Sequence, residues 1–167
     1  MEHQNTALNR FMRVPMIGYH KVTQQLKDSL IITPQTTMIS RSIMDLVIEV
    51  ARSSPSKKQV GAILLNKSKI VEQAVNLDTK SHPKQADYAK RVGRKEKIYL
   101  HAEIAALVKC RVECDTIVVA RLGGHDHNQL RNAKPCPICQ LALEEAGIKN
   151  VIYSTDNGFL FQYNKYQ

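Results

Sequence analysis

The 167-residue chain, with 43% hydrophobic and 23% charged residues, has the length and balance of one globular domain with a buried core. No run of 18 apolar residues is present, and the N-terminus lacks the apolar stretch of a signal peptide. We therefore expect a cytoplasmic protein without a membrane partner. The formal net charge of +9 favours an anionic partner, such as a phosphorylated small molecule or a nucleic acid.

The N-terminal part of the chain shows no sustained hydrophobic period and contains prolines and a glycine. We interpret residues 1–37 as an N-terminal extension, with one short helix near residues 21–30, and residues 38–167 as the folded domain. Apolar residues then recur at helical spacing over residues 39–50, which predicts an amphipathic helix at the start of the domain.

The next segments read as strands. Residues 59–66 and 69–76 are apolar enough for two strands, and the short turn between them predicts a hairpin. Residues 77–98 are polar and basic, and contain a proline and a glycine, so that we predict a long connection there. A connection of that length inside a compact domain is often functional.

Two further helices are predicted. The first opens at His101 and is followed by an apolar strand over residues 115–121. After a glycine-bearing loop, the second helix covers residues 137–146, where Gly147 is suited to end it. Both predicted helices begin with side chains that can bind a metal or transfer a proton: histidine and glutamate at the first, and two cysteines at the second.

The chain ends in two strands, over residues 150–154 and 159–163, that flank the turn sequence TDNG. Strands separated by helices imply parallel neighbours, whereas the first two and the last two strands are joined too tightly for a crossover helix. We therefore predict an α/β domain of three layers. Helices flank a mixed five-stranded sheet, and the final two strands form an antiparallel hairpin.

Four cysteines are present, and without a secretory signal they are better explained by metal ligation or burial than by disulfides. Cys136 and Cys139 lie three residues apart at the start of a predicted helix, so their sulfur atoms share one face. A helix N-terminus favours thiolates, and a thiolate pair suits zinc. A structural site completed by Cys110 and Cys114 is an alternative; burial of these two as small apolar residues is the simpler interpretation.

His101 is the candidate third ligand. Two thiolates and one imidazole leave the fourth tetrahedral position of zinc to water, as in catalytic rather than structural sites. Zinc lowers the pKa of that water, and Glu103 is placed to accept and pass on its proton. The joint pattern of His-x-Glu, a strand and Pro-Cys-x-x-Cys is typical of zinc-dependent nucleobase deaminases.

Through "HAE", 101–103, and "PCPIC", 135–139, the chain resembles the cytidine/deoxycytidylate deaminase superfamily, roughly over residues 38–163. The resemblance implies one zinc ion held by the three candidate ligands. It also implies hydrolysis of cytosine to uracil, in which water attacks C4 and Glu103 protonates N3 and the departing ammonia. Residues 38–167 are thus expected to be a zinc-dependent deaminase domain.

The resemblance also implies substrate contacts. Asn76 ends the second strand, where many members use an asparagine to bind the sugar. The backbone N–H of Ala102 is expected to bind the pyrimidine carbonyl. Arg121 and Lys134 flank the motif region and are candidates to contact a phosphate, although such residues often simply end strands and loops.

The substrate is predicted to be a cytosine nucleoside or nucleotide, of the cytidine, deoxycytidine or deoxycytidylate type. The histidine ligand is similar to that of deoxycytidylate, tRNA-adenosine and polynucleotide deaminases, whereas the tight final hairpin resembles free-cytidine deaminases. The alternative is cytosine, or adenine, in single-stranded DNA or RNA. The basic segment 84–97 favours it, but an aromatic content of 5% argues against extensive base stacking.

A non-catalytic, zinc-stabilised binding module is a lower alternative, because such a module has no use for the Glu103 carboxylate. His125 and His127 are candidates for a pocket mouth or a second metal, but a solvated loop is the favoured interpretation. Relatives commonly assemble as dimers or larger, so we expect a homo-oligomer.

Overall fold

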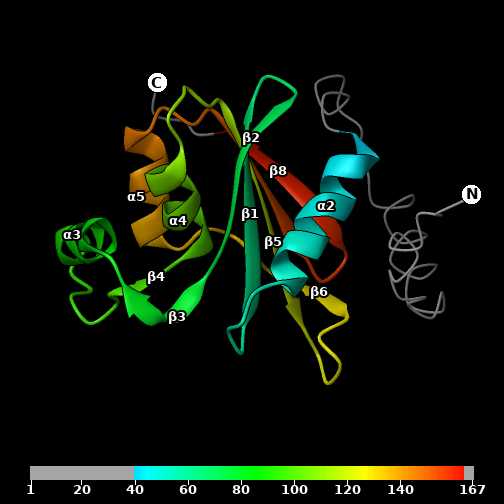
Figure 1. Ribbon diagram of the computed structural model, residues 1–167, viewed down its shortest axis with the longest axis horizontal. Helices are drawn as coiled ribbons and strands as arrows, with labels where there is room; N and C mark the ends of the chain where they lie inside the picture. Colours follow the sequence, from blue (N-terminus) through cyan, green and yellow to red (C-terminus); the bar gives the residue numbers. More distant parts are fainter. Residues whose placement is uncertain (1–39, 164–167) are drawn as a thin grey trace, which may run out of the picture.

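The computed structural model describes residues 40–163, so the predicted N-terminal extension and its short helix lie outside the described residues. Helices cover both faces of a central sheet, which Figure 1 shows edge-on. One face carries α3 (Pro83–Arg91), α4 (Ala102–Lys109) and α5 (Pro137–Glu145), and the other carries α2 (Arg41–Arg52). The predicted three-layer α/β architecture is confirmed. Within the described range, no helix combines the length and apolar character needed to cross a membrane.

The sheet follows the predicted mixed topology, with the strand order β2-β1-β5-β7-β8. The strands on this path are β1 (Gln59–Asn66), β2 (Lys69–Val75), β5 (Thr116–Gly123), β7 (Asn150–Thr155) and β8 (Gly158–Tyr163). β1 pairs antiparallel with both β2 and β5, while β5 and β7, which are joined through α5, pair in parallel. β7 and β8 form the predicted antiparallel hairpin.

The sheet has a sixth strand that the sequence reading placed in a loop. β6 (Gln129–Arg131) pairs antiparallel with β5, so the sheet has six strands rather than five. The strand is short and mostly polar, so the sequence shows no alternation of apolar and polar residues that would predict it. It turns the chain back over the end of β5 before α5 begins.

The prediction of one long connection over residues 77–98 was wrong. The segment contains β3 (Leu77–Ser81) and α3, and β3 pairs antiparallel with β4 (Tyr99–Leu100) just beyond it. α3 has Pro83 in its first turn, and Gly93 at φ 75° follows its end. The N–H groups of Gly93 and of the next residue donate to carbonyls of the last turn, which completes a Schellman motif.

Two hydrophobic clusters fill the space on either side of the sheet. One packs α2 against the sheet and includes Val47, Ile63 and Val118. The other packs the sheet against α4 and α5 and includes Ala105 and Leu143 among its members. The central strands β1 and β5 are buried over most of their length because both of their faces are covered.

Gly61 permits the close approach of α2 to β1. A Cβ atom at this position would lie 2.4 Å from the backbone nitrogen of Ala51 on α2. We expect Gly61→Ala to lower the free energy of unfolding by about 1–3 kcal/mol, because the helix must shift to relieve the overlap. Urea unfolding measures the change, with Lys69→Ala on the exposed edge of the sheet as the control. An unchanged midpoint for Gly61→Ala contradicts this packing.

Candidate metal centre and active site

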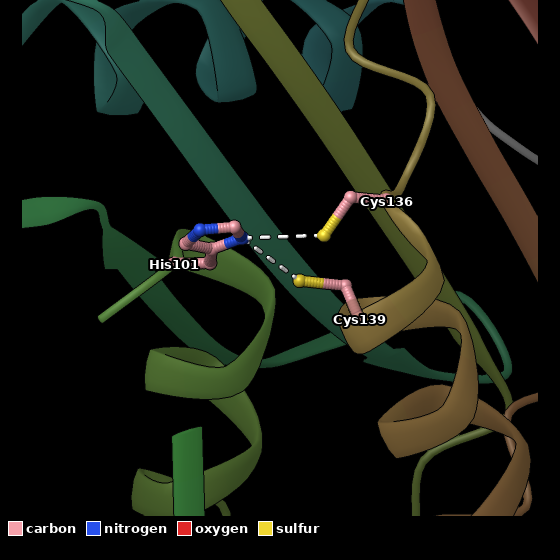
Figure 2. A group of neighbouring side chains, drawn as sticks. All are labelled: His101, Cys136 and Cys139. Atoms are coloured by element: carbon pink, nitrogen blue, oxygen red, sulfur yellow. Dashed lines mark hydrogen bonds between the residues drawn. The ribbon is translucent and has the colours of Figure 1, made fainter. Parts of the chain in front are cut away.

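The N-termini of α4 and α5 meet, and each begins with a predicted ligand. His101 is the N-cap of α4, and Cys136 is the N-cap of α5, where Pro137 occupies the first turn. Both N-caps have extended backbone, and neither side chain caps its own helix. The imidazole and the thiol therefore face each other, as Figure 2 shows.

The distances between the three candidate ligand atoms suit zinc. His101 Nδ1 lies 3.5 Å from Cys136 Sγ and 3.3 Å from Cys139 Sγ (Figure 2). Zinc bonds of about 2.3 Å to sulfur and 2.0 Å to nitrogen place tetrahedral nitrogen and sulfur ligands roughly 3.5 Å apart. All three atoms lie within 4.8 Å of one another, and residues 40–163 contain no other such group of three or more histidine, cysteine or acidic ligands.

The electrostatics of the cluster favour a cation. A hydrogen bond from the Cys139 thiol lowers the pKa of Cys136 to about 4, and the neighbouring His101 adds to this effect. The same hydrogen bond, together with burial, raises the pKa of Cys139. The hydrogen bond to Cys136 raises the pKa of His101. A Cys136 thiol with a lowered pKa, beside a second sulfur and at the N-termini of two helices, suits a soft divalent cation.

Glu103 lies in the first turn of α4, and its side chain is buried, with 6% of the residue exposed. Its carboxyl group is in hydrogen-bonding contact with the Cys139 thiol, and burial raises its pKa. No lysine or arginine among the described residues pairs with it. Burial of a carboxyl group without a lysine or arginine partner is costly, so this placement is typical of a functional site.

The two residues predicted to contact the substrate, Ala102 and Asn76, each retain a hydrogen-bond donor. Ala102 is the first residue of α4, where a backbone N–H has no acceptor within its own helix. Asn76 follows β2, and its Oδ1 accepts from the Val60 N–H at 2.9 Å and from the Ser54 hydroxyl at 2.8 Å. Its Nδ2 donates to the Lys58 carbonyl at 2.8 Å, which leaves one amide hydrogen.

A buried serine fixes the segment that leads to Cys136. Ser154 is fully buried, and its Oγ accepts from the Arg121 N–H at 3.0 Å and donates to the Arg131 carbonyl at 2.7 Å. The backbone N–H of Ala133 donates to the Ser154 carbonyl at 2.8 Å. These bonds hold the chain between β6 and α5 across the ends of β5 and β7, and thereby set where α5 begins.

The remaining cysteines lie at the other end of α4. Their sulfur atoms are 3.0 Å apart, and Cys110 is the C-cap of α4. The eight residues of α4 span about 12 Å, which separates this thiol pair from His101. Burial and the hydrogen bond with its partner thiol raise the pKa of Cys114 to about 12. Neither thiol is therefore placed to supply a fourth ligand to the cluster.

The other residues noted in the sequence lie outside the cluster. The His125 side chain is fully exposed beside Asp126, and neither His125 nor His127 belongs to a ligand group in the described part of the chain. Lys134 is exposed. The six basic residues of the segment 84–97 are all exposed, and one of them, Arg91, is paired with Glu145.

Gln85 is a site residue that the sequence reading missed. It is fully buried in α3, and its Oε1 accepts from the His101 backbone N–H at 3.2 Å. Its Nε2 donates to the Lys97 carbonyl at 3.1 Å. The available signal was Pro83 followed by Gly93, because proline just inside a helix start and glycine just past its end bracket a short helix.

A mixed sheet with helices on both faces, and with two cysteines and one histidine presented at helix N-termini, is the arrangement of a zinc-binding domain of catalytic type. The family model for the cytidine and deoxycytidylate deaminase zinc-binding region matches residues 38–155, well over half of the chain. The chain therefore belongs to this family of deaminases, and zinc is its cofactor.

Solved structures with similarity to the chain include dCMP deaminase from the cyanophage S-TIM5. The apo form is 22% identical, with 68% of this chain and 83% of that chain covered and a TM-score of 0.41. The complex of that enzyme with dCMP and dUMP is 21% identical, with 73% of this chain and 82% of that chain covered and a TM-score of 0.45. RibD from Acinetobacter baumannii is 19% identical, with 67% of this chain and 27% of that chain covered and a TM-score of 0.37. A search of curated proteins found no match.

Proposed function

We propose that this deaminase hydrolyses cytosine to uracil in a free nucleoside or nucleotide, with His101, Cys136 and Cys139 as its zinc ligands. The observation that carries the proposal is the cluster of three ligand atoms with the buried Glu103 carboxyl beside it. Zinc in a site with three protein ligands keeps a fourth position open and supplies a water that ionises near neutral pH.

Glu103 is proposed to carry the protons of the reaction. Addition of water to C4 of cytosine and departure of ammonia require one group that first accepts a proton and then returns it. Glu103 contacts the Cys139 thiol, so its carboxyl group lies beside the proposed zinc ligands. It would take one proton from the attacking water and pass it to N3. It would then take the proton of the new C4 hydroxyl and deliver it to the amino group, so that ammonia leaves as the C4–N bond breaks and the C4 carbonyl of uracil forms.

Two residues are proposed to hold the substrate. The N–H of Ala102, at the start of α4, would donate to the pyrimidine carbonyl and so orient C4 towards the attacking water. The amide of Asn76 is held rigidly by its bonds to Val60 and Lys58. Its remaining hydrogen would donate to a sugar hydroxyl, and activity on free cytosine equal to that on its nucleosides would contradict this role.

Arg121 supports a phosphorylated substrate. It lies two residues beyond Val119 on β5, and alternation along the strand directs both side chains to the face of the sheet that α4 covers. Its Nε is buried and has no hydrogen-bond partner among the described residues. A buried, unpartnered guanidinium nitrogen suits an anion, and a nucleoside monophosphate would bring one to the C-terminal end of β5.

We expect Arg121→Met to raise the KM for cytosine nucleoside monophosphates by about 10–100-fold, the loss expected for one charge-assisted hydrogen bond. The KM for the unphosphorylated nucleosides is expected to change little. Steady-state kinetics on both substrates check this prediction, with Lys69→Met at an exposed position of the edge strand β2 as the control. Equal loss on the nucleoside and the nucleotide would show that Arg121 does not recognise the phosphate.

The function is tested by ammonia release from cytidine, deoxycytidine, their monophosphates and single-stranded DNA and RNA oligonucleotides. The proposal predicts activity on the free substrates. The second candidate, deamination within a polynucleotide, draws on the exposed basic residues of segment 84–97 and on Tyr99, which is 52% exposed two residues before His101. Activity on oligonucleotides alone, falling steeply with salt, would favour that candidate.

We further propose that residues 1–37 form an extension to a deaminase domain over residues 38–167, and that the protein acts in the cytoplasm as a homo-oligomer. The family resemblance supports the assembly. Light scattering on the full-length protein, combined with size-exclusion chromatography, is expected to give the mass of a dimer or a larger assembly. A monomer at the working concentration of the assay would contradict it.

A further inference from the structure

We propose that Gln85 is a positioning residue of the zinc site, which fixes the backbone of His101 so that its imidazole meets the two cysteine sulfurs. The inference rests on the proposed role of His101 as a ligand. It does not depend on which molecule carries the cytosine, because Gln85 acts on the metal site rather than on the substrate.

The chemistry of an amide matches the two groups that Gln85 contacts. The side chain spans from α3 to the segment before α4, where Oε1 accepts the His101 N–H and Nε2 donates to the Lys97 carbonyl. Gln85 is fully buried, so both backbone groups would lose their partner if the amide were replaced by an apolar side chain. A glutamate would keep the acceptor for His101 and lose the donor to Lys97.

His101 depends on an outside partner because it is an N-cap. Its carbonyl accepts the Ala105 N–H at 2.9 Å and so belongs to the first turn of α4. Its own N–H precedes the helix and has no acceptor within it, and Gln85 supplies that acceptor. Both polar backbone groups of the ligand are thereby fixed, which leaves only the side-chain torsions of His101 to place Nδ1.

α3 is in turn attached to the helix that carries the cysteines. Ala89 of α3 packs in one buried cluster with Ile104 of α4 and with Ile138 and Cys139 of α5. Two hydrogen bonds also join the Arg91 guanidinium of α3 to the Glu145 carboxylate at the end of α5, one of them at 3.0 Å. α3 lies beside α4 and α5 on the same face of the sheet (Figure 1). Gln85 therefore fixes His101 relative to the cysteines.

The test compares zinc affinity and metal geometry in full-length variants. Gln85→Met keeps the length of the side chain and removes both hydrogen bonds. We expect it to raise the zinc dissociation constant about 10–100-fold, as loss of an outer partner of a metal ligand typically does. We also expect a changed visible spectrum of the cobalt(II)-substituted protein. Gln85→Glu keeps the bond to His101 and is expected to retain the wild-type cobalt spectrum even where its folding stability falls.

Val47→Ala is the control for a purely structural effect. Val47 is fully buried on α2, on the opposite face of the sheet, so this variant loses packing without touching the site. It is expected to keep the wild-type zinc affinity and cobalt spectrum. A Gln85→Met protein with wild-type affinity and spectrum overturns the proposal. If Gln85→Met does not fold, an altered cobalt spectrum in Gln85→Glu overturns it.

His101→Ala separates failure of this inference from failure of the ligand assignment. It is expected to lose zinc binding, which supports the assignment on which the role of Gln85 rests. If His101→Ala retains wild-type zinc affinity, the ligand assignment itself is overturned and the inference falls with it. If His101→Ala loses zinc while Gln85→Met does not, only the role of Gln85 is overturned.

Discussion

Glu103→Gln is expected to lower kcat for cytosine deamination by about 10²–10⁴-fold while the protein keeps its zinc, because the amide retains the shape of the side chain but cannot relay a proton. Glu103 is buried in the first turn of α4, so a side chain of equal size is needed to avoid a cavity. Ammonia release and zinc content, measured on the same preparation, check both parts of the prediction.

Glu113→Gln is the matched control for this experiment. Glu113 is exposed in the loop after α4, so the same change of charge there should leave kcat and zinc content at wild-type values. Wild-type kcat in Glu103→Gln would refute the proton-relay role. Loss of folding in Glu103→Gln, with no activity detected in the wild type, would favour the non-catalytic binding module instead.

The second large effect is expected at the ligands. His101→Ala, Cys136→Ser and Cys139→Ser should each reduce zinc content from about one ion per chain to a small fraction, because two remaining ligands do not hold the ion. Deamination should be lost in parallel. Metal analysis of dialysed protein measures the first effect, and ammonia release measures the second.

The thiol pair at the far end of α4 provides the control for the cysteine substitutions. Cys110→Ser and Cys114→Ser should keep zinc and activity, because α4 separates these residues from the cluster by about 12 Å. Loss of zinc from either of these variants, at unchanged folding stability, would mean that the ion is bound by a different set of ligands.

The metal centre could be predicted because it depends on short-range patterns. Cys136 and Cys139 lie three residues apart at one helix start, and His101 and Glu103 lie two apart at another. These local patterns can be recognised even where the rest of the fold is predicted incorrectly. The two hairpins were predictable for a related reason. The turns between β1 and β2 and between β7 and β8 are too short for a crossover helix, so each pair of strands must be antiparallel.

The residues around the metal centre were harder to predict from the sequence. α3 buries few large apolar side chains, and its exposed basic residues made the segment read as a connection. Gln85 could not be assigned without α3, because its role depends on a helix packed beside His101 rather than on a neighbour in sequence. The bonds of Asn76 to residues near Val60 likewise form only when β1 and β2 pair.

Zinc K-edge X-ray absorption of the full-length protein tests the central claim most directly. An open site of two cysteines and one histidine predicts two sulfur scatterers near 2.3 Å and two nitrogen or oxygen scatterers near 2.0 Å, one of the latter exchangeable with added ligands. A shell of four sulfurs, or protein purified without bound zinc at this site, would contradict it.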